Sequence, residues 1–271
     1  MLWIQEVNTM FREDIPYEKV EKKYCRSYWE IGFGLQKIDG QVPSEYLVSL
    51  ADEQIQNGLP YEEIEEKLTD YYQAQPEKGN AETDFSSLRI AELLSDDSFS
   101  LSPATLLGIH KKLFSGIEDF RYPVGKFREY NITKKEPVLS GDTVSYTDYG
   151  MIRETLQWDF SEEKDKNYTG HSKEKKAHEI MRFISNIWQV HPFAEGNTRT
   201  IAVFAIKYLR QLGFEIDNEP FKNHSRFFRD SLALANYHRH GKTDEYLRMF
   251  TENTLLNGEH KLEIKSIDDQ V

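Results

Sequence analysis

The chain has 271 residues, with 46 acidic and 34 basic side chains, a formal net charge of −12 and one cysteine. The negative charge argues against a nucleic-acid binder, and a single cysteine excludes an internal disulfide framework and fits a reducing compartment. No window approaches the roughly 18 apolar residues of a membrane span, and the N-terminal residues lack the pattern of a secretory signal. We therefore expect a cytoplasmic protein with no nucleic-acid or membrane partner.

Residues 1–75 are expected to form an N-terminal helical unit. Its helical patterns lie in residues 17–38, 43–56 and 60–73. Gly32, Gly34 and Gly40 weaken or end the first pattern, whereas a proline opens the second and the third, as prolines often do at a first helical turn. The polar stretch 74–80 contains proline and glycine, and it predicts a linker to the rest of the chain.

A larger helical domain is expected over residues 76–260, followed by a charged tail in residues 261–271. Its helical patterns lie near residues 84–95, 103–115, 149–160, 172–190 and 198–212. Residues 121–147 differ, because β-branched and aromatic residues flank a Ser-Gly-Asp turn, and this pattern predicts a short β-hairpin. The expected fold class is therefore all-α, or mainly α, with a small β-hairpin and an N-terminal helical unit.

The sequence HPFAEGN, residues 191–197, joins two of these helices. Each of the two helices carries apolar residues at spacings of three and four, so each buries one face. A short polar loop between two core helices has its atoms held in place by the scaffold. This loop is therefore the best candidate in the chain for chemistry.

Individual residues of the loop suggest how it would act. Gly196 begins the second helix, whose first free N–H groups and dipole favour a phosphate. Asn197 and Arg199 add donors that suit phosphate oxygens. A carboxylate beside such a cradle would repel phosphate unless a cation lay between them, so Glu195 predicts bound Mg²⁺. His191 is the only group in the loop whose ordinary pKa, about 6.5, suits a general base near neutrality.

These residues resemble the signature of the Fic family, H-x-F-x-[D/E]-G-N-x-R, at every specified position. The matching residues are His191, Phe193, Glu195, Gly196, Asn197 and Arg199. The resemblance implies a Fic-like helical fold and transfer of AMP from ATP to a Ser, Thr or Tyr hydroxyl of a target protein or of the chain itself. It implies that His191 takes the proton of that hydroxyl and that Glu195 holds Mg²⁺. Gly196 and Asn197 would cradle the phosphates, and Arg199 would grip the leaving pyrophosphate.

The resemblance extends beyond the motif. Residues 136–147 correspond to the family's flap, which lays an extended segment of the protein substrate beside the site by strand pairing. Asn236 and Tyr237, just past a helix end, are candidates for the adenine pocket, with an ordinary helix C-cap as the alternative. Thr198 stands where glycine is commonest and is counted among the nucleotide-binding residues. Ala202 stands where the family commonly has a second arginine that serves the γ-phosphate.

The N-terminal unit resembles small antitoxin proteins that silence Fic enzymes through a helix with the pattern [S/T]-x-x-x-E-[G/N]. Register places Leu35, Asp39 and Gly40 at the three specified positions. Aspartate is one methylene shorter than glutamate, and the arginine partner is replaced by Ala202. We therefore expect a regulatory unit that docks on the catalytic domain and inhibits weakly. A packing bundle without a regulatory role is the alternative.

Three functions follow from these residues. AMP transfer is favoured because the motif is intact. A phosphate or phosphocholine transferase, in which the nucleotide is presented differently, stays open because the second arginine is missing. A non-catalytic nucleotide-binding interaction module is the alternative from another class, and His191 argues against it because phosphate binding needs no base. The target protein and the oligomeric state are left open.

Overall fold

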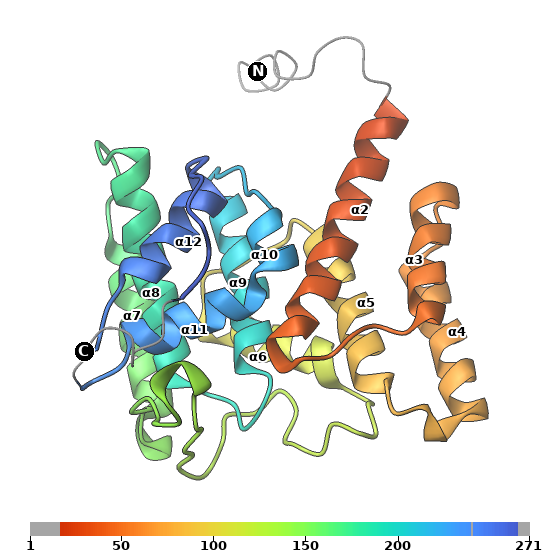
Figure 1. The fold of residues 1–271 in the computed structure, drawn as a ribbon, viewed down its shortest axis with the longest axis horizontal. Coiled ribbons are helices and arrows are strands. Elements are labelled where there is room, and N and C mark those ends of the chain that lie inside the picture. The colour runs from red at the N-terminus through yellow and green to blue at the C-terminus, as the bar shows by residue number, and fades with distance from the viewer. Residues whose placement is uncertain (1–16, 240, 265–271) are drawn as a thin grey trace.

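The computed structural model describes residues 17–239 and 241–264, and within these ranges the chain is helical without a β-strand (Figure 1). The helices of the described residues are α2 (Tyr17–Gln36), α3 (Glu45–Asn57), α4 (Tyr61–Ala74), α5 (Ala81–Ser95), α6 (Pro103–Phe114), α7 (Ile152–Asp165), α8 (Lys173–Val190), α9 (Asn197–Gln211), α10 (Glu219–Asn223), α11 (Ser225–Ala235) and α12 (Glu245–Leu255). Short 3₁₀ turns lie at η1 (Lys37–Asp39), η2 (Pro76–Lys78), η3 (Pro137–Leu139) and η4 (Tyr149–Met151). The expected mainly α fold is confirmed.

Helix α9 is the central element of the fold and packs against α5, α6 and α8 (Figure 1). Every residue from 197 to 209 is buried. Apolar side chains such as Ile201, Phe204 and Leu209 contact neighbours on several sides, which is typical of a helix enclosed by the core. Because the motif loop leads directly into α9, packing along this helix also fixes the position of the loop.

Helix α2 runs through Gly32 and Gly34 without a break, so the expectation that the glycines end the helical pattern holds only for Gly40. A Cβ at Gly32 would lie 2.7 Å from the carbonyl oxygen of Ser87 in α5. A Cβ at Gly34 would lie 2.4 Å from the carbonyl oxygen of Phe221 in α10. The two glycines therefore permit the close packing of α2 on α5 and α10, and this packing outweighs their weak helix propensity.

The β-hairpin expected over residues 121–147 is not formed, because this segment contains no strand. The predicted turn exists, but the chain before it coils into η3. The carbonyl of Glu136 accepts hydrogen bonds from the N–H groups of Leu139 (3.0 Å) and Gly141 (3.1 Å). Pro137 has no N–H to offer to a strand ladder. Local turn bonds thus replace the ladder, and the flap is an irregular loop.

Helices α3 and α4 lie side by side at one edge of the molecule, and α4 packs on α5 (Figure 1). Polar contacts reinforce this packing. Asp84 of α5 accepts hydrogen bonds from the backbone N–H of Ser44 (2.9 Å) and the hydroxyl of Tyr72 in α4 (2.7 Å). Arg89 of α5 pairs with Glu65 of α4 at 2.6 Å. The N-terminal helices are thereby tied to α5, which in turn contacts α9.

None of the helices in the described ranges is both long and apolar enough to cross a membrane. Residues 261–264 of the expected charged tail follow α12 without regular structure, and residues 265–271 lie outside the described residues. The N-terminal residues 1–16, which lack a secretory pattern, also lie outside them.

Candidate active site

His191 is the residue at which α8 ends, and its backbone lies in the left-handed region with φ 49°. Its Nδ1 lies 3.3 Å from the carbonyl oxygen of Trp188. A carbonyl can only accept a hydrogen bond, so Nδ1 carries the ring proton and Nε2 is the basic nitrogen. Nε2 is buried and has no hydrogen-bond partner among the described residues. Burial, followed by the positive charge of Lys134, holds the pKa of the imidazole well below its ordinary value. At neutral pH, His191 is therefore an uncharged base with a free lone pair.

Arg128 fixes the backbone on both sides of His191. Its guanidinium donates to the carbonyls of His191 (2.8 Å), Val190 (3.3 Å) and Tyr130 (2.8 Å). It also donates to the carbonyl of Thr147, at the end of the flap. Because Arg128 is buried, water cannot easily replace these bonds. This residue was not among the predicted site residues, since nothing in the local sequence distinguishes a buried arginine from a surface one.

Phe193 anchors the loop beneath the site. Its ring is fully buried and stacks on His110, with ring centroids 3.9 Å apart. Nε2 of His110 donates to the carbonyl of Glu195 (3.1 Å), and Nδ1 accepts the N–H of Gly125 (2.9 Å). Burial lowers the pKa of His110 to about 4, so the ring is neutral, as one donating and one accepting nitrogen require. The sequence carried no signal for this second histidine.

The turn into α9 requires glycine at position 196. Gly196 has φ 75°, and a Cβ there would lie 2.4 Å from an aromatic ring of α6. Asn197 closes the turn with its amide, which accepts from the N–H of Phe193 (2.9 Å) and donates to its carbonyl (2.7 Å). The hydroxyl of Thr198 accepts from the indole N–H of Trp188 (3.1 Å). These side chains shape the loop, and the backbone N–H groups in the first turn of α9 are left for a phosphate.

Glu195 is ionised and paired. Its Oε1 accepts the N–H of Gly196 (2.9 Å), and its Oε2 lies 3.0 Å from the ammonium of Lys134. Burial raises the pKa of this carboxyl, but Lys134, the Gly196 N–H and Arg199 outweigh burial and bring the pKa below its ordinary value. An ionised carboxylate beside an anion-binding helix start fits Mg²⁺, which proteins bind through one or two carboxylates together with substrate phosphates. Lys134 was not predicted from the sequence.

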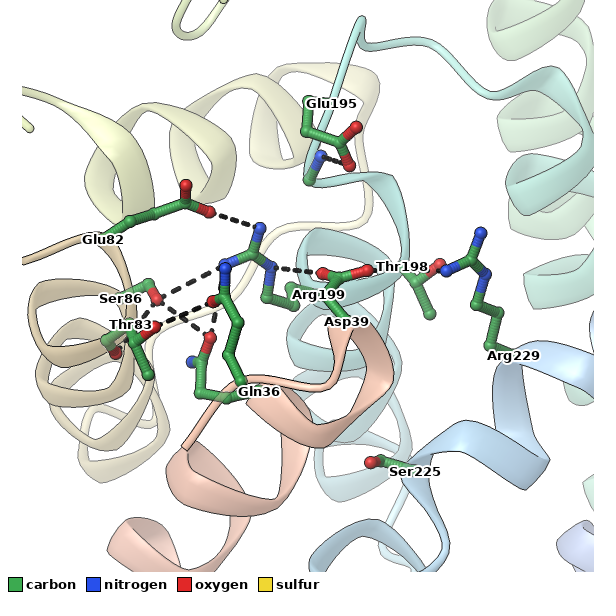
Figure 2. Close-up of polar contacts among 12 residues, drawn as sticks. Gln36, Asp39, Glu82, Thr83, Ser86, Glu195, Thr198, Arg199, Ser225 and Arg229 are labelled. Carbon is green, nitrogen blue, oxygen red and sulfur yellow. Dashed lines mark hydrogen bonds and ion pairs between the residues drawn. The ribbon is translucent and has the colours of Figure 1, made fainter. Parts of the chain in front are cut away.

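Arg199 is buried, and side chains from α2, η1 and α5 surround it (Figure 2). Its Nη2 lies 2.7 Å from Oε1 of Glu82, and its Nη1 lies 3.2 Å from Oε1 of Gln36. Its Nε is 3.5 Å from Oδ2 of Asp39 but makes no hydrogen bond. Ala202 is fully buried in the core. The guanidinium is thus held by groups from α2, η1 and α5.

One cavity brings most of the predicted site residues together. Its lining residues are Asp39, Lys134, His191, Glu195, Gly196, Asn197, Thr198, Arg199 and Arg229. Asp39 reaches the cavity from η1, and Gly40, the other predicted regulatory residue, ends η1 with φ 71°. The cavity has a volume of about 10 Å³, which is room for no more than about one water molecule. A nucleotide phosphate can therefore enter only if one of the lining side chains gives way.

Asn236 and Tyr237, predicted for the adenine pocket, do not border this cavity. The amide of Asn236 donates to the hydroxyl of Ser185 (2.8 Å), and Asn236 lines a separate hollow of about 650 Å³ between α8 and α12. The hydroxyl of Tyr237 donates to Asp142 of the flap (2.8 Å). Asn236 is also the C-cap of α11, which is the structural role that sequence reasoning held as the alternative.

Three solved Fic-domain structures resemble this fold. The N-terminal Fic domain of Bep8, a VirB-translocated effector from Bartonella sp. 1-1C, is 17% identical with a TM-score of 0.49, over 69% of this chain and 84% of that one. The N-terminal Fic domain of a putative cell filamentation protein from Bartonella quintana is 18% identical with a TM-score of 0.49. The match covers 70% of this chain and 83% of that one. BepC from Bartonella tribocorum, with bound AMPPNP, is 16% identical with a TM-score of 0.47. The match covers 69% of this chain and 86% of that one.

A comparison with curated proteins finds no match to this sequence. The model of the Fic/DOC family matches residues 100–209, which include α6, the flap, α8, the motif loop and most of α9. The matched segment thus contains the base, the carboxylate and the helix start described above. The chain therefore carries a domain of the Fic/DOC family in residues 100–209.

Proposed function

We propose that this chain is a protein adenylyltransferase, which transfers AMP from ATP to a Ser, Thr or Tyr hydroxyl of a protein. The observation that carries the proposal is the neutral Nε2 of His191, buried and without a hydrogen-bond partner, beside the start of α9. A site that only binds an anion needs no base, whereas attack by a hydroxyl is accelerated by one. The intact motif within a Fic/DOC domain supports the same reaction.

In the proposed reaction, the hydroxyl oxygen attacks the α-phosphorus of ATP as its proton passes to Nε2 of His191. The new O–P bond forms while the bond to the bridging oxygen breaks, and pyrophosphate leaves with that electron pair. The N–H groups at the start of α9 and the guanidinium of Arg199 stabilise the negative charge of the phosphates. Positioning by the fixed loop adds to general-base help from His191, which is typically worth about 10²–10⁴-fold.

Glu195 is the residue that would hold Mg²⁺, because its ionised carboxylate is a hard oxygen ligand next to the phosphate cradle. When bound, Mg²⁺ supplies neutralisation of phosphate charge. The contribution of the chain is to present Oε2 of Glu195, for which the ammonium of Lys134 competes.

The protein substrate is proposed to lie along the flap, residues 136–147. Backbone–backbone hydrogen bonds within the flap are confined to residues 136–142. In residues 143–147 the carbonyls of Val144, Ser145 and Thr147 accept side-chain hydrogen bonds. An extended peptide would therefore pair with the remaining backbone groups of this stretch, in a mode of binding that depends mainly on main-chain bonds.

Asp39 is proposed to restrain the site weakly, as the N-terminal pattern predicted. Its carboxylate contacts Arg199 at 3.5 Å and Arg229 at 3.4 Å, and its side chain is 30% exposed. Ion pairs of this kind contribute about 0.2–1 kcal/mol each. Asp39→Asn should therefore raise the affinity for ATP by about two- to thirtyfold, as measured by isothermal titration calorimetry. An unchanged affinity would make the N-terminal unit a packing bundle without a regulatory role.

The proposed reaction is tested with ATP labelled at either the α- or the γ-phosphate. The full chain is incubated with Mg²⁺ and each label, alone and with cell lysate, and His191→Ala is the matched control. Covalent transfer of the α-label only, lost in His191→Ala, is the expected result. Transfer of the γ-label would instead identify a phosphotransferase. Binding of ATP without transfer of either label would identify a nucleotide-binding module.

A further inference from the structure

Asp39 lies between the guanidinium groups of two arginines from different helices (Figure 2). Its Oδ2 is 3.5 Å from Nε of Arg199 in α9, and its Oδ1 is 3.4 Å from Nη1 of Arg229 in α11. One carboxylate oxygen thus faces each guanidinium. An anion held in this way by two arginines is the arrangement that proteins use to recognise phosphates and carboxylates.

The two arginines share their cavity with other groups that attract anions. The cavity is also lined by the first turn of α9, whose free N–H groups and dipole favour negative charge. Lys134 lines it as well, with its ammonium paired to Glu195 at 3.0 Å. Nε of Arg199 is buried and makes no hydrogen bond, so Asp39 satisfies it by charge alone. A phosphate oxygen would be a better acceptor for this donor, because hydrogen bonds between ionised groups are short and strong.

Arg229 is held in place by the flap. Its Nη2 lies 3.2 Å from Oε2 of Glu136, a fully buried carboxylate. The hydroxyl of Tyr146 donates to the other oxygen of Glu136 (3.1 Å). Glu136 thus compensates the cost of burying one end of the guanidinium, while Nη1 faces the cavity. This anchoring distinguishes Arg229 from a surface arginine that happens to lie nearby.

No other arginine of the described residues lines this cavity. Position 202 of α9 is an alanine buried in the core, so α9 contributes only Arg199. Arg226, one turn before Arg229 on α11, is exposed, and its ion pair with Asp230 has an N–O distance of 3.9 Å. A second guanidinium can therefore reach the cavity only from Arg229.

We infer that Arg199 and Arg229 form a paired anion site for the β- and γ-phosphates of a nucleoside triphosphate, and that Asp39 is the internal anion this ligand displaces. Arg229 then supplies from α11 the guanidinium that α9 lacks at position 202. Because the site takes the terminal phosphates, it selects a triphosphate over a monophosphate. The inference rests on the proposed nucleotide-transfer function and names a residue that determines its substrate.

The test measures the affinities of ATP and AMP by isothermal titration calorimetry on the full chain with Mg²⁺. All variants are made in an Asp39→Asn background, which removes the internal anion. Arg229→Ala should weaken ATP binding by about tenfold or more, because charge-assisted bonds are lost, and should change AMP binding by less than about twofold. Arg226→Ala, on the same helix, should change neither affinity. Arg229→Lys keeps the charge without the planar fork, so its affinity for ATP should lie between those of Arg229 and Arg229→Ala.

The results separate this inference from the proposed function. Equal losses of ATP and AMP affinity in Arg229→Ala, or no loss, would overturn the inference even if AMP transfer is observed. The expected affinities without any transfer would support the paired site and overturn the adenylyltransferase. If Asp39→Asn binds no ATP, both fail. Thermal unfolding of each variant checks the fold, and Arg229→Lys decides the question if Arg229→Ala does not fold.

Discussion

The ammonium nitrogen of Lys134 lies 3.0 Å from Oε2 of Glu195, so the carboxylate expected to hold Mg²⁺ already pairs with a cation of the chain. Both side chains are partly exposed, at 23% and 31%. An ion pair of this kind is weak, about 0.2–1 kcal/mol, and a divalent cation held by Glu195 would displace it. If Glu195 holds Mg²⁺ as proposed, Lys134 sets a modest threshold for its binding.

Lys134→Met should lower the Mg²⁺ concentration needed for half-maximal AMP transfer by about two- to fivefold, because the competing ammonium is removed. The measurement is a Mg²⁺ titration of the transfer rate at saturating ATP. Lys135→Met is the matched control, since Lys135 is exposed and does not line the cavity. A higher Mg²⁺ requirement in Lys134→Met would show that Lys134 binds phosphate and does not compete with the metal.

AMP transfer should stay active at pH values below 6.5. A general base works only when unprotonated, so activity is lost as pH falls through its pKa. Burial and Lys134 depress the pKa of His191, and the acid limb of kcat/KM should therefore lie well below the ordinary histidine value. Lys134→Met should move this limb to higher pH, because one nearby positive charge is gone. An acid limb at pH 6.5 or above in the unmodified chain would contradict this account.

Stability should decline on acidification because of His110. Its pKa is about 4 in the folded chain and about 6.5 when unfolded, so the unfolded state binds more protons between these values. The contribution of neutral His110 to the free energy of unfolding is fully present above the unfolded pKa and is lost as pH falls toward 4. Between pH 7.5 and pH 5 the chain should lose about 2 kcal/mol more than His110→Gln, as measured by urea unfolding. Parallel losses in the two proteins would assign the effect to other groups.

Gly196→Ala should destabilise the chain and abolish most nucleotide binding, because φ is positive and the new Cβ meets an aromatic ring at 2.4 Å. Gly79→Ala is the matched control, with φ 65° and no atom within 4 Å of the added Cβ. Left-handed backbone alone costs about 1–2 kcal/mol for an L residue. The difference between the two variants in chemical unfolding isolates the steric contact, and equal losses would mean that the ring moves aside.

Arg128→Lys should lower both stability and kcat. The planar guanidinium donates to four carbonyls around His191 and the flap, and an ammonium cannot reach all of them. Leaving buried carbonyls unpaired costs about 1–3 kcal/mol each. The exposed Arg121 provides the control variant Arg121→Lys. Because Arg128 positions the loop and does not bind nucleotide, kcat should fall more than the affinity for ATP. An opposite split would place Arg128 in the nucleotide site.

Local patterns sufficed wherever neighbours in the chain are also neighbours in space. The amphipathic periods predicted the helices on both sides of the motif, and the helical pattern near residues 103–115 predicted α6. His191, Glu195 and Gly196 were recognisable because a loop of a few residues holds the base, the carboxylate and the helix start together. The short spacing is what the chemistry requires, so it is visible in the sequence.

The hairpin prediction failed for a physical reason. The preference of β-branched and aromatic residues for strands depends on a partner strand and a half-buried surface. In residues 121–147, Arg128 and the turn around Glu136 take up backbone carbonyls that a ladder would have used. The local preference was present, but the tertiary contacts satisfied the backbone in another way.

Lys134, His110, Arg128 and Arg229 could only be found in the folded chain. Each is a single polar residue without a local pattern. His110, Arg128 and Lys134 contact the motif loop from segments distant in sequence, and Arg229 lines the same cavity and contacts Asp39. Asp39 was predicted from register, but its partners, Arg199 and Arg229, are decided by how η1 packs against α9 and α11. The type of chemistry can be predicted from the contiguous motif. The cations that adjust the electrostatics of the site are placed by tertiary packing, because charge and hydrogen bonding act through space.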